Sequence, residues 1–358
     1  MAVSWLARLA ADAPTPVFAV AGVDAWGAVQ ELRGDPRIRL AATPRHAAVL
    51  LVAGTILAGH GEALRRVHDQ LPRPRAVVVW RAPGTGPAIP ALAVVDGSAD
   101  EVVSAVGRAH ASILADPTRA QADLLPDEEP TEWRGVGPFG QGGEGMMGGT
   151  PYGRPMAMTG DDRDGLALDQ LHLTLGPFLD PLPPGLTLDV TLQGEVLQDV
   201  AVDRAAPPVV DHAAPGDPAT PAAAARRGLH WLAHALHVEG LDALAGRAAH
   251  LASQVAVGDV AADRSADRLA RLVTATGVLR SLRGVGAVDG ADASDRWRQR
   301  LAAIVAALRD GVVPRALEPA PSDDAALAGL LVGVTLTDAV STLVSLELPG
   351  VLRPAVAA

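Results

Sequence analysis

Residues 38–80 read IRLAATPRHAAVLLVAGTILAGHGEALRRVHDQLPRPRAVVVW. Two apolar runs, VLLVA and AVVVW, flank a stretch whose apolar residues recur at helical spacing. Short apolar runs without polar alternation are typical of strands that are buried on both faces of a parallel sheet. The stretch therefore predicts a strand, a helix and a second strand that lies parallel to the first.

The same alternation extends over residues 1–115. We predict strands at Pro16–Ala21, His46–Ala53, Arg75–Trp80 and Ala91–Val95, and helices at Ala25–Arg33, Gly61–Leu71 and Asp100–Leu114. Ser98 stands just before the last of these helices, where its hydroxyl can cap the first turn. Strands that alternate with helices favour a doubly wound α/β domain with a flavodoxin-like parallel sheet.

The rest of the chain divides into three parts. Residues 116–165 are rich in Pro, Gly, Asp and Glu and predict a connecting loop. Residues 166–203 alternate apolar and polar positions in three runs, which predicts a β-meander with a turn at Gln193-Gly194. Residues 220–358 predict a helical bundle, with helices at Ala222–Val238, Leu241–Val255, Ala261–Leu282, Ala293–Leu308 and Asp323–Leu346. The second domain, residues 166–358, is thus expected to be α+β.

Charge and composition exclude several classes of function. The 358 residues carry 41 acidic and 30 basic side chains, a formal net charge of −11, which argues against a nucleic-acid partner. The chain contains no cysteine, so disulfides and thiolate ligands for iron–sulfur clusters are excluded. The N-terminal residues lack the apolar core of a signal peptide, and no apolar run reaches the ~20 residues of a spanning helix. We therefore expect a protein that is soluble or is held at a membrane by partners.

Residues 38–80 resemble the cluster-bearing small subunit of respiratory complex I (NADH–quinone oxidoreductase) and of the related nickel–iron hydrogenases. In that family the segment reads R-x-x-SPRHAD-x-LLV-x-G and then ALR-x-x-Y-D-Q-x-P-x-P-x-x-V. Here the matching stretches are RLAATPRHAAVLLVAG and ALRRVHDQLPRPRAV. The resemblance covers roughly residues 16–115. It implies an α/β domain that in the family holds an iron–sulfur cluster on cysteines, close to the arginine that corresponds to Arg45.

The places of the cluster ligands carry other residues in this chain. The first strand of the family ends in a turn with cysteines, and Val23 and Trp26 stand at or near those places. Pro83 and Ser98 stand near the third and fourth places. Because a cluster requires thiolates, the resemblance implies a domain that keeps the frame of the family and has lost its cofactor.

Residues 175–200 read LGPFLDPLPPGLTLDVTLQGEVLQDV. They resemble the start of the large quinone-pocket subunit of complex I, where a GPQHPSTHG turn precedes a strand pair that ends LDGE-x-V-x-D. The residues that keep this frame are Gly176, Pro177, Gly185, Gly194, Glu195, Val196 and Asp199. Both histidines of the family turn are replaced, and Leu179 and Pro184 lie near their places. The resemblance implies that two subunits that meet at the quinone site are fused here without their redox residues.

A glycine- and methionine-rich segment of the connecting loop is the best remaining candidate site. Its residues of interest are Gly142, Gly143, Met146, Met147, Tyr152, Arg154, Met156 and Met158. Glycine permits close backbone approach and methionine adapts to irregular apolar surfaces, so the loop can contact a partner or line a cavity. The alternative is a connector that is ordered on its own chain. For Arg45 two roles are open, a contact between the domains and support of the turn after Pro44.

Three histidines recur on one face of a predicted helix, at His230, His234 and His237. The first two have the i, i+4 spacing of metal ligands. The first and third are ~10 Å apart along the helix axis, so all three cannot bind one ion. We expect an interface or a solvated face, and a metal on two of these histidines stays open. We assign no catalytic residue, cofactor or metal ligand to the chain.

The resemblance implies a structural or coupling subunit of a complex I-like assembly that translocates ions, without catalytic activity of its own. The expected partners are antiporter-like or quinone-site membrane subunits, which would hold the chain on the cytoplasmic face of the cell membrane. A second hypothesis is a quinone-contacting subunit of an active oxidoreductase, with Tyr152 in the cavity. A third is a soluble protein that binds a small ligand in the α/β cleft. Under the first hypothesis the two fused domains dock on each other, as their family counterparts do.

The chain purified without oxygen is expected to carry no iron–sulfur cluster, because it offers no thiolate ligand. Iron analysis and visible absorbance of the full chain measure this directly. Stoichiometric iron together with a sulfide-to-iron absorption band would contradict the prediction.

Overall fold

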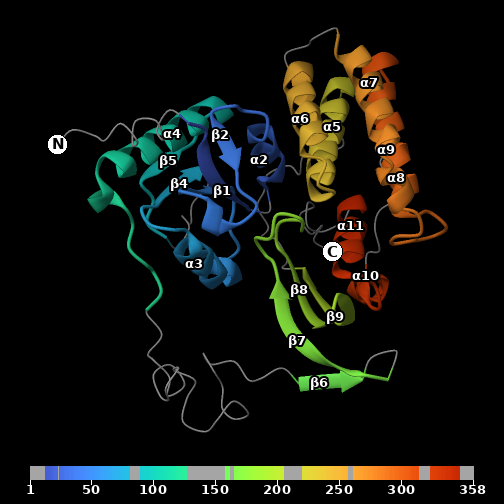
Figure 1. Cartoon of the computed structure of the whole chain (residues 1–358). Coiled ribbons are helices and arrows are strands. Elements are labelled where there is room, and N and C mark those ends of the chain that lie inside the picture. The colour runs from blue at the N-terminus through green and yellow to red at the C-terminus, as the bar shows by residue number, and fades with distance from the viewer. Residues whose placement is uncertain are drawn as a thin grey trace, which may run out of the picture.

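The computed structural model describes residues 13–22, 24–80, 89–126, 158–161, 165–204, 220–256, 261–313 and 323–346. Within these residues the chain forms a five-stranded parallel sheet with helices, a four-stranded antiparallel sheet and a group of helices (Figure 1). The predicted combination of a parallel-sheet α/β part with a later antiparallel and helical part is confirmed. No helix in the described ranges has the length and apolar character needed to cross a membrane.

The parallel sheet orders its strands β2-β1-β3-β4-β5. The strands are β1 (Thr15–Ala21), β2 (Ile38–Leu40), β3 (Val49–Ala53), β4 (Ala76–Trp80) and β5 (Ala93–Val95), and the helices are α2 (Trp26–Leu32), α3 (Gly61–Gln70) and α4 (Ala99–Ala115). One face packs against α2 and α4 through side chains such as Leu51 and Val78. The other face packs against α3 through Leu50 and Leu64. Helices therefore cover both faces of the sheet.

The boundaries of the second predicted strand differ from the structure. The strand begins at Val49, and Pro44–His46 form a short 3-10 turn (η1) instead. Proline favours such a turn because its ring restricts φ and removes a backbone donor. The three-residue strand β2 was not predicted, because it is too short to show a periodic pattern.

The first residues of the predicted connecting loop are held against the α/β part. After the 3-10 turn η3 (Pro117–Arg119), the carboxylate of Asp69 accepts the backbone N–H groups of Leu124 and Leu125 at 3.0 and 2.8 Å. Arg75, with 1% of its surface exposed, donates to Asp69 and to Asp123. A buried guanidinium requires such acceptors, so these contacts direct the chain along α3 as it leaves the domain.

The antiparallel sheet contains one strand more than the predicted meander. Its order is β6 (Met158–Asp161), β7 (Ala167–Leu175), β8 (Leu186–Gln193) and β9 (Val196–Arg204). The prediction of an irregular loop over residues 116–165 is therefore wrong at β6, whose four residues pair with β7. So short a segment has no pattern of its own and gains its structure from the neighbouring strand. The predicted turn is present, with Gly194 at a φ of +60°.

The helical residues form two groups with separate cores. The helices are α5 (Pro221–Val238), α6 (Asp242–Ala256), α7 (Ala262–Ala275), α8 (Val278–Ser281), α9 (Ala293–Arg309), α10 (Asp324–Leu331) and α11 (Leu336–Ser345). Helices α5 to α9 enclose one apolar core. Helices α10 and α11 share a second core with β8 and β9. The predicted helix over residues 261–282 is divided at Gly277, whose φ of +87° is incompatible with a continuing helix.

The predicted helix over residues 323–346 is also divided, for a tertiary reason. Leu197 of β9 donates to the carbonyl of Val334 at 3.0 Å and accepts from Gly333 at 2.7 Å. The side chain of Thr335 then caps α11 by accepting from Asp338. The segment between α10 and α11 thus supplies hydrogen bonds to the edge of β9, and pairing with the sheet overrides the helical pattern.

Buried arginines hold the end of α11 against the larger helical group. Arg296 donates to the Ser345 hydroxyl at 3.0 Å and to the Gly286 carbonyl at 2.7 Å. The Trp231 indole donates to the Val344 carbonyl at 2.9 Å, and the Arg300 guanidinium lies 4.4 Å from the centre of the same indole. These contacts join the two helical cores.

Gly176 begins the turn between β7 and β8 at a φ of +95°, and a Cβ there would lie 2.2 Å from the Leu186 carbonyl oxygen. Gly176→Ala is expected to lower the free energy of unfolding by clearly more than the about 1 kcal/mol of a positive φ alone. Gly277→Ala is the matched control, because Gly277 has a φ of +87° and open space at its Cβ position. Urea denaturation compares the two variants. Equal losses of unfolding free energy in the two variants would show that the nearby Leu186 carbonyl does not add to the cost at Gly176.

Candidate functional site

Helix α2 joins the α/β part to the helical part of the molecule. Trp26, in its first turn, packs against the core of α5 to α9. The indole meets the His234 ring edge-on, with ring centres 5.8 Å apart. Glu31 on the same helix pairs with Arg226 of α5, and Figure 1 shows α2 on the side of the α/β part that faces α5 and α6. The α/β part therefore docks through one helix.

The turn between β7 and β8 makes the reciprocal contact. Phe178 packs against the α3 side of the parallel sheet. Its ring meets the His60 ring edge-on, with centres 5.9 Å apart. Each part thus places one aromatic side chain against the core of the other, and the apolar surface buried in this way favours docking.

An ion pair lies at the same junction. The carboxylate of Asp180, next to Leu179 in the turn, accepts from Arg33 Nη2 at 3.4 Å and lies 3.7 Å from His237 Nε2. Burial acts to raise the pKa of Asp180, but electrostatic interactions with the neighbouring His234, Arg33 and His237 and the hydrogen bond from Arg33 outweigh burial and hold the pKa below its ordinary value. Asp180 is therefore an anion at neutral pH, and Arg33 is its permanent partner.

The three helix histidines have different environments. His230 and His234 are 6% and 5% exposed, so neither is solvated. His234 lies in the interface with Trp26, which is one of the two environments expected. His237 is partly exposed and bonds Asp242 through Nδ1 at 2.6 Å. In the described part of the chain, no group of three or more potential ligands is arranged for a metal ion.

Burial keeps the two inner histidines uncharged. It lowers the pKa of His230 to about 4, and the charge of Arg226 acts in the same direction. It also lowers the pKa of His234 to about 4, with Arg33 and His237 adding to the shift and Asp180 and a hydrogen bond with the Pro181 backbone opposing it. Both imidazoles are therefore neutral at neutral pH. The junction then contains the contact of Trp26 with a neutral imidazole, beside the ion pair of Arg33 with Asp180.

Little space remains at the junction. A cavity lined by Arg33, Asp180, His237 and Phe18, among others, has a volume of ≈10 Å³. This is room for about one water molecule and far below the ~300 Å³ at which small-molecule sites begin. The arrangement at this point serves the packing of two folded parts.

The structure describes some of the predicted site residues and not others. Those outside the described residues are Val23, Pro83, Gly142, Gly143, Met146, Met147, Tyr152, Arg154 and Met156. Met158 begins β6 and pairs with Gln170. Ser98 caps α4 by accepting the N–H of Glu101 at 3.4 Å. Leu179 is 39% exposed, and Pro184 is buried.

The residues that make the junction were mostly not predicted. Arg45 is exposed on η1 and has no hydrogen bond or ion pair to a described residue, and the two roles considered for it stay predictions. Arg33 and Asp180 were missed, although Asp180 is the one charged residue in the Pro-rich turn 176–188. A charge in so apolar a turn signals a partner elsewhere in the chain. No protein-family model matches the chain.

The free energy of unfolding is expected to fall as the pH decreases from about 6.5 toward 4. A histidine in the unfolded chain takes up its proton at about pH 6.5. Folded His230 and His234 take up theirs only at about pH 4. The stability that depends on neutral histidine is therefore complete above this window and is lost within it. Each histidine contributes at most about 3 to 4 kcal/mol, at about 1.4 kcal/mol per pKa unit.

Urea unfolding at several pH values measures this slope. His230→Leu combined with His234→Leu should reduce the slope of stability against pH between about pH 6.5 and about pH 4, and the remainder is expected from His60 and His110, whose pKa values burial also lowers. His46→Leu, a change on the surface, is the control and should keep the slope. A double variant with the original slope would show that other groups cause the dependence.

Proposed function

We propose that the chain is a cofactor-free structural or coupling subunit of a complex I-like assembly that translocates ions across a membrane. The observation that carries this proposal is the junction between α2 and the β7–β8 turn. Trp26 of α2, near a cluster-ligand place by resemblance, packs on α5, and Arg33 at the end of α2 pairs with Asp180, which is next to Leu179, near a quinone-histidine place. In the resembled family the two subunits also meet at the quinone site. The fusion would keep that contact, with packed side chains in place of redox groups.

The sheet order supports the same relationship. The order β2-β1-β3-β4-β5 is that of flavodoxin-like sheets, in which the strand order reverses between the first and third strands. We therefore assign the α/β part to the flavodoxin-like class, as the resemblance to the small cluster-bearing subunit implies.

An uncovered apolar surface on β7 supports a role in assembly. Helices α10 and α11 cover the core face of β8 and β9. Leu171 and Leu173 continue that face, because they pair with the inward-facing Leu192 and Val190 of β8, yet they are 47% and 39% exposed. Adjacent exposed leucines of this kind mark interaction surfaces. We assign this face to a membrane subunit, which would hold the chain on the cytoplasmic side of the membrane.

The affinity-tagged full chain should co-purify from detergent-solubilised membranes of its own cells with an antiporter-like or quinone-site membrane subunit in near-equal amounts. Leu171→Asp should lower the recovered subunit about tenfold, because a charge in an apolar contact weakens binding. Leu168→Asp is the matched control, since Leu168 is 40% exposed on the opposite face of the same strand. It should change recovery by less than about twofold. Quantitative mass spectrometry measures the ratios.

Recovery of the unaltered chain without any such membrane subunit would overturn the proposed function. Co-purification that both variants reduce equally would retain the role in assembly and contradict the assignment of the β7 face.

A further inference from the structure

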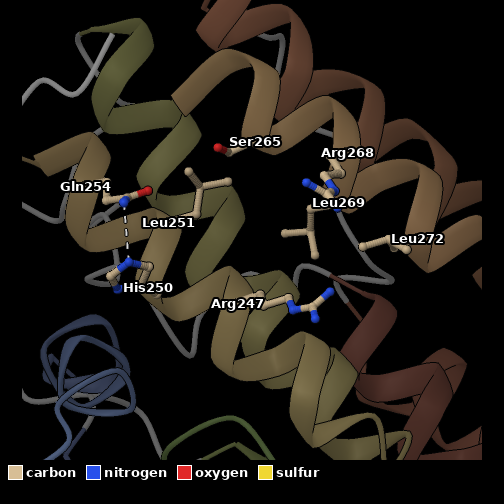
Figure 2. Close-up of a pocket in the computed structure, with 8 residues that line it drawn as sticks. All are labelled: Arg247, His250, Leu251, Gln254, Ser265, Arg268, Leu269 and Leu272. Atoms are coloured by element: carbon tan, nitrogen blue, oxygen red, sulfur yellow. Dashed lines mark hydrogen bonds between the residues drawn. The ribbon is translucent and has the colours of Figure 1, made fainter. Parts of the chain in front are cut away.

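A groove between α6 and α7 forms a second surface of distinct chemistry (Figure 2). Its volume is ≈390 Å³. Leu251 of α6 and Leu269 of α7 form its floor and are 3% and 5% exposed, and Leu272 continues the floor along α7. The groove therefore offers an apolar strip between two helices.

Two arginines flank this strip. Figure 2 shows Arg247 from α6 and Arg268 from α7 on either side of Leu269. Both side chains are exposed, and neither forms a hydrogen bond or ion pair with a residue that the structure describes. His250 and Gln254, at the other end, bond each other at 3.3 Å. The rim thus carries two arginines without a partner among the described residues at one end and a hydrogen-bonded polar pair at the other.

The chain as a whole has more acidic than basic residues, 41 against 30, whereas two arginines line this groove. The acidic residues nearest in sequence on α7 act elsewhere: Asp263 accepts the backbone N–H of Arg264, and Asp267 acts on Arg309. The local charge of the groove is therefore opposite to that of the whole molecule. Such a reversal favours an acidic ligand, because it attracts carboxylates to a surface that the rest of the chain repels.

An amphipathic helix fits both features of the groove. Its apolar residues at i, i+3 or i+4 and i+7 can lie along Leu251, Leu269 and Leu272. Glutamate or aspartate beside that stripe can accept paired hydrogen bonds from the Arg247 and Arg268 guanidinium groups. We propose that the α6–α7 groove docks an acidic amphipathic helix of a partner protein. This inference does not rest on the proposed function.

The test uses the full chain and a dye-labelled synthetic helix of about 14 residues, about four turns, with a leucine stripe flanked by glutamate. Fluorescence anisotropy should show binding that weakens with salt, because the contacts at the rim are charged. The same peptide with lysine in place of glutamate should not bind. Arg247→Glu combined with Arg268→Glu should weaken binding of the acidic peptide at least about tenfold.

Arg271→Glu is the matched control, because Arg271 is an exposed arginine of α7 that does not line the groove. It should change the affinity by less than about twofold. Leu272→Ser tests the floor without a change in charge and should also weaken binding. Circular dichroism and thermal melting establish that each variant is folded, and if the charge reversal does not fold, Arg247→Gln with Arg268→Gln replaces it with the same expectation.

Three results would overturn the proposal. The first is no binding of the acidic peptide by the unaltered chain, and the second is an equal loss of affinity in the Arg271→Glu control. The third is a different occupant: sedimentation with phosphatidylglycerol vesicles, or self-association, that depends on Arg247 and Arg268 while the peptide does not bind. In that case the groove would take a lipid surface or a second copy of the chain.

Discussion

The arrangement of the two halves depends on an exchange of aromatic side chains between their cores. Trp26 of the α/β half packs on α5 to α9, and Phe178 of the second half packs on the α3 side of the parallel sheet. The apolar area removed from water supplies the favourable free energy of this contact. The Arg33–Asp180 pair beside it contributes orientation more than energy, because the loss of water around both charges offsets much of their attraction.

The second half differs from the first in how its surfaces are covered. Strands β3 and β4 of the parallel sheet are buried along their full length. In the antiparallel sheet, the segment between α10 and α11 bonds to β9, whereas β7 stays exposed or half-exposed along its length. The two candidate partner surfaces, the β7 face and the α6–α7 groove, both lie in this half. The α/β half supplies α2, the helix that packs against α5 to α9 of the second half.

Local patterns predicted most of the elements and little of the candidate site. The apolar runs at β3 and β4, the Ser98 cap of α4 and the Gln193-Gly194 turn depend on residues close in sequence, and all are present. The errors have tertiary causes. β6 exists through pairing with β7, and the last predicted helix is divided because its middle bonds to β9. The junction was missed because the sequence does not show that Arg33 and Asp180, which are far apart along the chain, form an ion pair.

By itself, the sequence determined that the described part of residues 1–115 forms a parallel sheet with helices, since continuous apolar runs alternate with amphipathic ones. It also determined that no cysteine thiolate is available to any ligand. Only the tertiary structure decided that His230 and His234 are neutral and that Trp26 fills an interface. It alone left Leu171, Leu173 and the α6–α7 arginines open to solvent. The reason is that burial and charge pairing are properties of neighbours in space, which are contributed by distant parts of the chain.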